Sequence, residues 1–297
     1  MEIRWAPLKE QKAIAHVLGT LDDKIELNRK TNETLEGIAK ALFKSWFVDF
    51  DPVRAKAEGR PTGLPDEISE LFPDSFEESE LGEIPSGWEA TTISNLCEVV
   101  TKGTTPTSIG GSFSSSGIPF YKVESISDSG QIIPGKCAFI SEEVNNMLAR
   151  SQINKGDILF SIAGTIGRVA LMGIKDVPAN TNQALAIVRA KKNLVSPDFL
   201  YLYLRDKERI ELARSKTVQS VQANFSLGEL KNLPLVMPDD RSRSLFEEIL
   251  APIQKRIFLC HTDSLNLAVI RDTLLPRLIS GELRVPDAEK MLEEVGI

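Results

Sequence analysis

The chain has few of the residues that catalysis and metal binding need. Its 297 residues include only two histidines, His16 and His261. The three cysteines, Cys97, Cys137 and Cys260, lie far apart and form no Cys-x-x-Cys pair. That usage indicates a reducing compartment and no metal site. Both histidines fall in helical stretches, off the apolar positions, so we interpret them as surface residues.

Long apolar runs are absent as well. No run reaches the roughly 18–20 residues that a membrane-spanning helix requires. The first residues, Met1 to Pro7, have no apolar core of the kind that a secretory signal carries. We therefore expect a cytoplasmic protein with no membrane partner.

The sequence also contains none of the common catalytic signatures. The phosphate-binding GxxxxGK[ST], the dinucleotide-binding GxGxxG, HExxH, GxSxG and Asn-Pro-Pro-aromatic patterns are all missing. The triplet Glu10-Gln11-Lys12 resembles part of a nuclease motif but lacks its upstream Pro-Asp partner. We expect no catalytic residues, no resident cofactor and no metal. The chain is predicted to bind a partner and not to make or break covalent bonds.

Positive charge is scarce overall, since the formal net charge is −7. A net negative charge argues against a nucleic-acid partner. However, residues 58–83 hold nine acidic residues and one basic residue, Arg60, which accounts for the whole excess. The remainder is nearly neutral, which permits DNA binding without predicting it.

Heptad periodicity is abundant. From Ile14 to Trp46 the apolar positions alternate steps of four and three, and such a repeat indicates one long helix packed on another. This first seam consists of Ile14, Leu18, Leu21, Ile25, Asn28, Asn32, Leu35, Ala39, Leu42 and Trp46.

A second seam repeats the first at an offset of 232 residues. Its members include Phe246, Leu250, Ile253, Ile257, Cys260, Ser264, Leu267, Arg271 and Leu274. Any long amphipathic helix has an apolar stripe, but both stripes weaken at matching positions, at Asn28 and Asn32 and again at Cys260 and Ser264. Matched interruptions at one offset favour two related helices. Polar groups in a seam can fix the register and the number of partners.

Composition divides the chain into four parts. We predict a long helix in residues 1–50, a proline-rich acidic linker in 51–85, an α+β domain in 86–238, and a second long helix with a tail in 239–297. Within the linker, a short helix is expected near Asp66–Leu71. The fold class is therefore α+β, with one α+β domain flanked by two long helices that form an antiparallel coiled coil. Pro276 should kink or end the second helix, and a short charged tail follows from Pro286.

Short runs of alternating residues separated by turns predict the strands of the middle domain. They are Thr91–Ile93, Glu98–Thr101, Ile118–Val123, Ile158–Ile162, Val169–Met172 and Ala184–Val188. Helices are expected at about Glu142–Arg150 and from Pro197 to about Arg214.

Several turns of this domain have residues suited to contacts with nucleic acid. The segment from Gly164 to Arg168 places two glycines and a base between two strands, which lets backbone N–H groups approach a phosphate. The amides of Asn182 and Gln183 can pair with adenine edges. An ordinary hairpin and a plain turn explain the same two segments. The full set of candidates is Lys102, Thr104, Thr105, Lys122, Gly164, Thr165, Gly167, Arg168, Asn182, Gln183, Lys216 and Gln219.

The order of these segments resembles the specificity (S) subunit of Type I restriction–modification systems. The motifs that carry the resemblance are Pro7-Leu8-x-Glu10-Gln11-x-x-Ile14-Ala15, Leu42-Phe43-Lys44-Ser45-Trp46-Phe47-Val48-Asp49-Phe50-Asp51-Pro52, Ile84-Pro85-x-Gly87-Trp88, Gly156-Asp157-Ile158-Leu159-Phe160-Ser161 and Leu278-Ile279-Ser280-Gly281-Glu282-Leu283. A full S subunit has two recognition domains that alternate with two helices. This chain has one recognition domain between two helices, so it resembles the second half of an S subunit with the central helix retained.

The resemblance implies a non-catalytic subunit whose recognition domain, residues 86–238, reads one half of a bipartite target in double-stranded DNA. Its helices would set the spacing of the target. They would also dock the methyltransferase (M) subunits, which carry S-adenosylmethionine and methylate adenine, and restriction (R) subunits would join through the complex. The alternative is a coiled-coil scaffold whose α+β domain binds protein, which the negative net charge favours.

Overall fold

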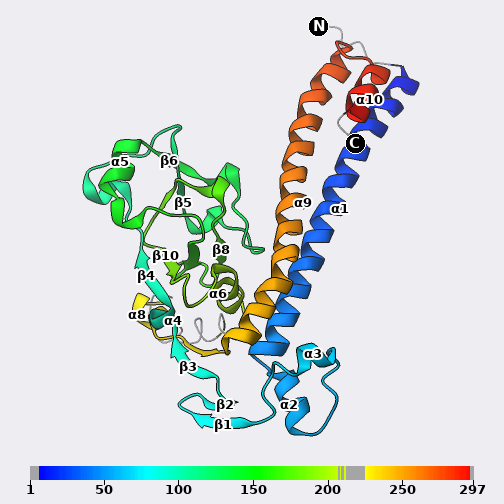
Figure 1. The fold of residues 1–297 in the computed structure, drawn as a ribbon. Helices are drawn as coiled ribbons and strands as arrows, with labels where there is room; N and C mark the ends of the chain where they lie inside the picture. Colours follow the sequence, from blue (N-terminus) through cyan, green and yellow to red (C-terminus); the bar gives the residue numbers. More distant parts are fainter. Residues whose placement is uncertain (1–6, 207, 209–210, 212–224, 295–297) are drawn as a thin grey trace. The chain divides into compact units, whose positions relative to one another are not determined.

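A computed structural model describes residues 7–206, 208, 211 and 225–294 (Figure 1). The chain divides into two compact units. Unit 1 comprises Met1–Ala41 and Glu248–Ile297, and unit 2 comprises Leu42–Glu247. Within the described residues, no helix combines the length and the apolar character that crossing a membrane requires.

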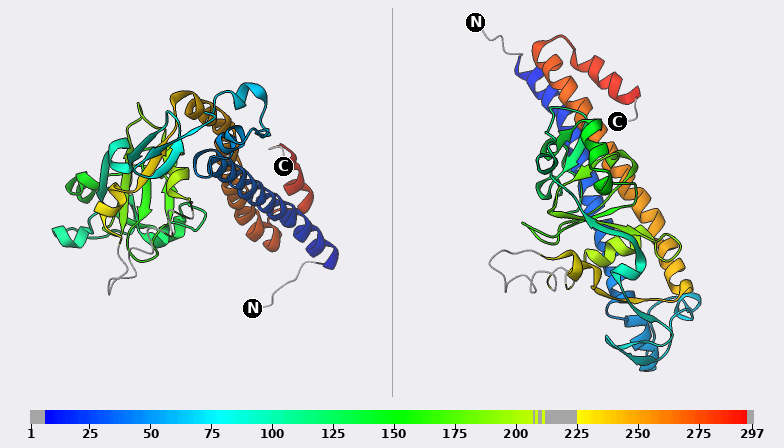
Figure 2. Two further views of the ribbon diagram at one scale, coloured as in Figure 1. Left: turned by 90° about the horizontal axis from the view of Figure 1, so that it is seen from below. Right: turned by 90° about the vertical axis from the view of Figure 1, so that its left-hand side faces the viewer.

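Unit 1 is built from two long helices, α1 (Leu8–Phe47) and α9 (Asp240–Ser280), whose last and first turns belong to unit 2. The two helices run side by side in all three views (Figures 1 and 2). Asn28 Nδ2 donates to Asp263 Oδ2 at 2.8 Å, and Arg271 Nη1 pairs with Asp22 Oδ1 at 2.7 Å. As residue numbers rise along α1 they fall along α9, so the pair is antiparallel. The predicted fold class is confirmed.

The predicted seam residues all lie at buried or half-buried positions. Ile14, Leu21, Asn32, Ala39, Trp46, Phe246, Leu250, Cys260, Leu267 and Leu274 are buried. Leu18, Ile25, Asn28, Leu35, Leu42, Ile253, Ile257, Ser264 and Arg271 are half-buried. The polar interruptions differ in their bonding. Asn28 reaches Asp263, Ser264 Oγ donates to the Cys260 carbonyl at 2.9 Å, and the buried Asn32 Oδ1 accepts no hydrogen bond from any described group.

The prediction that Pro276 could end the second helix is wrong. Helix α9 continues through both Pro252 and Pro276 to Ser280. A proline inside a helix costs roughly 3 kcal/mol. Burial of the flanking Leu274 and Leu278 opposes that cost.

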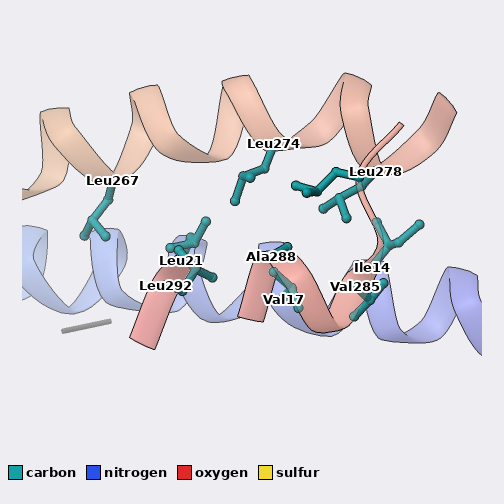
Figure 3. Close-up of a cluster of buried hydrophobic side chains, with 10 residues drawn as sticks. Ile14, Val17, Leu21, Leu267, Leu274, Leu278, Val285, Ala288 and Leu292 are labelled. Carbon is teal, nitrogen blue, oxygen red and sulfur yellow. The ribbon is translucent and has the colours of Figure 1, made fainter. Parts of the chain in front are cut away.

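The tail is also more ordered than its charge suggested. Residues Val285–Glu294 form helix α10, which folds back beside the end of the coiled coil (Figure 2). Its apolar residues Val285, Ala288 and Leu292 join a buried cluster with residues of both long helices (Figure 3). The α1 residues of that cluster include Val17, which lies outside the heptad seam. A third helix therefore covers this end of the pair.

Unit 2 is an α+β domain whose main sheet has four antiparallel strands in the order β4-β10-β7-β8. These strands are β4 (Cys97–Lys102), β10 (Leu185–Ala190), β7 (Ile158–Ser161) and β8 (Val169–Leu171). A smaller sheet, β6-β5-β9, consists of β5 (Ile118–Tyr121), β6 (Ala138–Ile140) and β9 (Asn180–Thr181). A third pairing joins β3 (Glu89–Thr92) to β11 (Pro234–Met237). All six predicted strands are confirmed, and β6, β9 and β11 are additional.

Short helices complete unit 2. The α-helices are α4 (Ile93–Leu96), α5 (Glu142–Met147), α6 (Pro197–Leu204) and α8 (Leu227–Lys231), and the 3-10 helices are η1 (Pro106–Ile109), η2 (Val123–Ser125), η3 (Pro134–Lys136), η4 (Ala149–Ser151) and η5 (Ile174–Asp176). Ser141 and Ser196 cap α5 and α6, since each side-chain oxygen accepts a backbone N–H of the first turn.

Residues 51–85 have more secondary structure than an extended linker. They form helix α2 (Asp51–Ala57), the short helix α3 (Asp66–Ser69) and a hairpin of β1 (Phe76–Ser79) and β2 (Gly82–Pro85). Helix α1 stops at Phe47, and Phe50 takes a left-handed conformation with φ of 57° before α2 begins at Asp51, with Pro52 in its first turn. The expectation of an extended linker is corrected here, because apolar residues in the acidic segment, such as Phe72 and Ile84, are buried.

Aromatic rings join distant segments within unit 2. The Phe47 ring lies 5.8 Å from Trp88, 5.1 Å from Phe199 and 5.0 Å from Phe246. Trp46 stacks edge-on against Phe72 at 4.9 Å. The last turn of α1, the first turns of α9, helix α6 and the start of β3 thus share one aromatic core.

The seam can be tested with two leucines of α1. Leu21 is 0% exposed, whereas Leu27 is 63% exposed. We expect Leu21→Ala to lower the free energy of unfolding by about 2–5 kcal/mol, because it leaves a cavity among the three helices. Leu27→Ala should change it by about 0.5 kcal/mol or less. Urea unfolding followed by circular dichroism measures both, and equal losses would contradict the arrangement.

Candidate nucleic-acid interface

Four loops meet at one end of the main sheet. Because neighbouring strands are antiparallel, the end of β4 lies beside the start of β10, and the end of β7 lies beside the starts of β10 and β8. The register confirms this, since Ala186 pairs with Lys102 and Leu185 pairs with Ser161. We define the loop end as residues 102–105, 122, 162–168 and 181–184. Strand β5 reaches it too, because Tyr121 pairs with Thr181 of β9. The predicted residues from Lys102 to Gln183 therefore come together, although they span 82 positions of sequence.

Gly103 allows the first two loops to touch. A Cβ at this position would lie 2.0 Å from the Thr181 carbonyl oxygen, so no other residue fits without a backbone shift. Next to it, the Thr104 N–H donates to the same carbonyl at 3.0 Å. The Thr105 hydroxyl then donates to Gln183 Oε1 at 2.6 Å. Lys102, Thr104 and Thr105 are thereby fixed beside the amide pair.

The two amides are presented differently. Asn182 Oδ1 accepts the Ala184 N–H at 3.1 Å, which closes a turn on its own backbone. Gln183 is exposed, and its oxygen has a second lone pair beyond the one that Thr105 uses. Its amide nitrogen makes no hydrogen bond to the described residues. Gln183 thus keeps both the acceptor and the donors that pairing with an adenine edge requires.

The turn from Gly164 to Gly167 is shaped by two left-handed glycines. Their φ angles are 72° and 84°, a region that side chains disfavour. The buried Ser161 holds the turn from within, since its hydroxyl donates to the Thr165 carbonyl at 2.6 Å and accepts the Arg168 N–H at 2.7 Å. Gly164 and Thr165 are exposed at the tip, where their backbone can be approached from solvent.

Arg168 has a different environment from the one the sequence suggested. Its Nη1 donates to the carbonyls of Val123 at 3.2 Å and Ile126 at 2.9 Å, and its Nη2 pairs with Asp128 at 3.0 Å. The side chain is 25% exposed. The guanidinium thus ties the turn to the segment after β5, and most of its donors are already occupied.

Other cations at the loop end are less committed. Lys102 is exposed and makes no ion pair within the described part of the chain. Lys122 lies with its Nζ 5.0 Å from the centre of the Phe113 ring. Arg150 is exposed and reaches Thr104 Oγ1 through one long hydrogen bond of 3.4 Å. Sequence reasoning missed Arg150 and Phe113, because neither lies in a motif and only the fold brings them here.

The loops after β4 and β7 and before β10 contain no acidic residues, whereas the segment after β5 has Asp128, which pairs with Arg168. Residues 99–123, 158–175 and 177–197 contain no Asp or Glu, although the chain as a whole has a net charge of −7. The negative charge is concentrated elsewhere, above all in residues 58–83. A DNA backbone is attracted by the cations that lie close to it. The local excess of cations at the loop end therefore matters more for DNA binding than the net charge of the whole chain.

Two predicted residues, Lys216 and Gln219, lie outside the described residues. Within the described part, no three or more His, Cys, Asp or Glu residues gather as a metal site would require. Burial raises the pKa of the Cys97 thiol to about 12, and burial also raises the pKa of Cys137. Both thiols are therefore protonated at neutral pH, and a protonated thiol is a poor nucleophile.

Comparisons with known proteins match this architecture. Residues 85–259 match the family model described as the Type I restriction modification DNA specificity domain. The chain is 28% identical to the Type I restriction enzyme HindI specificity subunit of Haemophilus influenzae, over 93% of this chain and 68% of that protein. It is 27% identical to the MjaIX specificity subunit of Methanocaldococcus jannaschii, over 97% of this chain and 62% of that protein.

A solved structure supports the fold. The Type I restriction-modification system S subunit from M. genitalium aligns with a TM-score of 0.57 at 16% identity, over 92% of this chain and 61% of that one. The chain thus spans roughly two thirds of the length of the relatives it matches. With the family model covering more than half of its residues, the chain belongs to the Type I restriction–modification DNA specificity family.

Proposed function

We propose that this chain is a non-catalytic recognition subunit that reads one half of a bipartite DNA target. Residues 86–238 act as the target-recognition domain, and the helices of residues 1–50 and 239–297 dock methyltransferase subunits. These subunits supply S-adenosylmethionine chemistry, and restriction subunits join through the complex. The observation that carries the proposal is the loop end of the main sheet, where amides and cations gather and the loops at the ends of β4, β7 and β10 contain no acidic residues.

The loop end offers both kinds of contact that DNA reading uses. Gln183 presents an amide suited to an adenine edge, and Lys102 and Arg150 present charges suited to phosphates. The exposed tip at Gly164 and Thr165 adds backbone N–H groups. A scaffold that binds protein would not need acid-free loops around exposed amides, so the family relation and the local charge both favour DNA over the alternative.

The helices suit a spacer. At 1.5 Å per residue, the 40 residues of α1 give a rod of about 60 Å. Helix α9 packs antiparallel on that rod, and α10 covers one end of the pair. Both contacts stiffen the rod, because one buried cluster joins the three helices. A stiff rod can hold two recognition sites at a fixed distance, and that distance sets the non-specific gap of a bipartite target.

One face of α9 is suited to docking the methyltransferase. Phe258, Leu265, Val269 and Ile279 are exposed and follow a second heptad spacing on the side away from the seam. At the matching offset of 232, Phe258 and Leu265 correspond to the acidic residues Glu26 and Glu33 of α1, and Glu26 pairs with Arg29 at 2.6 Å. The two related helices thus share a seam but differ in their outer faces. An exposed apolar stripe of this kind indicates a protein partner.

The central proposal is tested by co-purifying the full chain with the methyltransferase subunit of its organism and mapping methylated adenines. We expect a bipartite motif of which this chain specifies one half. The isolated chain should bind DNA weakly at physiological salt, near or above the weak end of the range of about 10⁻⁴–10⁻⁶ M for non-specific binding. Methylation without sequence preference, or tight binding by the chain alone, would contradict the proposal.

The contrasting environments of Arg168 and Gln183 generate a second prediction. Arg168→Ala should lower the free energy of unfolding by about 1–3 kcal/mol, because the Val123 and Ile126 carbonyls lose a charged donor. It should weaken binding to all sequences. Gln183→Ala should leave stability unchanged and relax preference at one position by roughly 1–3 kcal/mol. Thermal melts and binding to single-base variants of the target separate the two, and an unchanged preference with Gln183→Ala would exclude that residue as a reader.

The docking face is tested by Leu265→Glu, which gives α9 the residue that α1 carries at the matching position, Glu33. We expect the affinity for the methyltransferase subunit to fall by roughly tenfold or more, since binding would bury an unpaired charge. Leu27→Glu, at an exposed position of α1 outside the α9 stripe, is the matched comparison and should lower the affinity less than Leu265→Glu does. Titration calorimetry measures both, and equal effects would remove α9 as the docking helix.

A further inference from the structure

An exposed aromatic ring contacts Lys122, a residue of the loop end. Phe113 lies in the loop between β4 and β5 and is 39% exposed. Its ring packs edge-on against the fully buried Phe120 at 5.3 Å. The ammonium of Lys122 also contacts the Phe113 ring and lies 5.0 Å from its centre. Because Phe120 holds the ring in place and part of the ring is exposed to solvent, Phe113 is available for a ligand.

The backbone under both residues is fixed. Beside Phe113, the Ser114 N–H donates to the Phe139 carbonyl at 2.9 Å. The Lys122 N–H donates to the buried Ser125 hydroxyl at 3.1 Å, and its carbonyl accepts the Ser125 N–H at 2.9 Å. Ser125 Oγ in turn donates to the Lys136 carbonyl at 2.9 Å. The backbone of neither residue has to be ordered when a ligand binds, which removes that part of the entropic cost of association.

The charge of Lys122 is not neutralised by a carboxylate. It forms no ion pair with any acid among the residues that the structure describes, and residues 99–123 contain none. A cation over an aromatic face is attracted by the electrons of the ring, which biases where the flexible side chain points. The ring thus holds the ammonium of the residue that follows Tyr121, and Tyr121 pairs with Thr181, the residue before Asn182.

We propose that Phe113 and Lys122 form a specificity element of the DNA interface. The exposed edge of Phe113 contacts the 5-methyl group of a thymine in the major groove, and Lys122 contacts a neighbouring phosphate. Phenylalanine is suited to this reading, because the thymine methyl is the only apolar group that a standard base presents there. The inference rests on the proposed function and names the residues that give it preference at one position.

The test replaces each thymine of the half-site in turn by deoxyuridine, which removes only the methyl group. Binding is measured with the full chain in complex with its methyltransferase subunit. For the unaltered chain, we expect one thymine whose replacement weakens binding about fourfold, the effect of one buried methyl group. With Phe113→Ala, the duplexes with thymine and with uracil at that position should bind equally. Because both duplexes are compared on one preparation, partial loss of folded protein does not change the ratio.

Lys122→Ala supplies a second readout. It should weaken binding to all sequences and reduce the slope of log affinity against log salt by about one. Two matched controls lie away from the loop end. Leu194 is 38% exposed on the loop after β10, and Lys155 is exposed on the loop before β7. Leu194→Ala should keep the thymine-to-uracil ratio, and Lys155→Ala should keep the salt slope.

The outcomes separate this inference from the function on which it rests. If the complex binds target and unrelated duplexes alike, the proposed function fails. If it selects its half-site but Phe113→Ala keeps the thymine-to-uracil ratio, only the role of Phe113 is overturned. A half-site without thymine, or one in which no thymine responds to the replacement, overturns that role as well.

Discussion

The aromatic core of unit 2 is the constraint on which the recognition domain depends. Phe47 contacts Trp88, Phe199 and Phe246, and these rings come from the end of α1, the start of β3, helix α6 and the first turns of α9. Because aromatic pairs combine large buried area with directional preference, four segments separated by up to 199 residues share one core. The strands can therefore diverge into loops elsewhere without loss of the domain, and the loop end of the main sheet is where they do so.

Charge in this protein has to be considered by location. The chain is acidic overall, yet the loops that meet at the ends of β4, β7 and β10 contain no acid. Lys102, Lys122 and Arg150 lie there without a carboxylate partner among the described residues, whereas Arg168 is committed to Asp128 and two carbonyls. Arginine thus supports a turn at Arg168 and is a candidate DNA contact at Arg150. Only the surroundings of each side chain distinguish the two roles.

The two long helices illustrate how a repeat can diverge in use. Both keep a heptad seam, and both have polar groups at matching places in it. Their outer faces differ in part, since α9 exposes Phe258 and Leu265 where α1 has Glu26 and Glu33, and Glu26 pairs with Arg29. Burial in the seam constrains one side of each helix. The opposite side is free to become either a solvated surface or a docking surface.

The sequence by itself determined the long helices, the six main strands and the family, because heptad steps, alternating strands and turn residues are local patterns. It did not reveal α10, the hairpin in residues 76–85 or the passage of α9 through two prolines, since burial against distant residues outweighs local preference there. At the candidate site, the motifs identified Gln183 and the Gly164 turn. Only the tertiary structure placed Arg150 against Thr104 and Phe113 against Lys122, and committed Arg168 to the backbone. A side chain's role depends on its neighbours in space, and those are set by strand pairing between residues far apart in the chain.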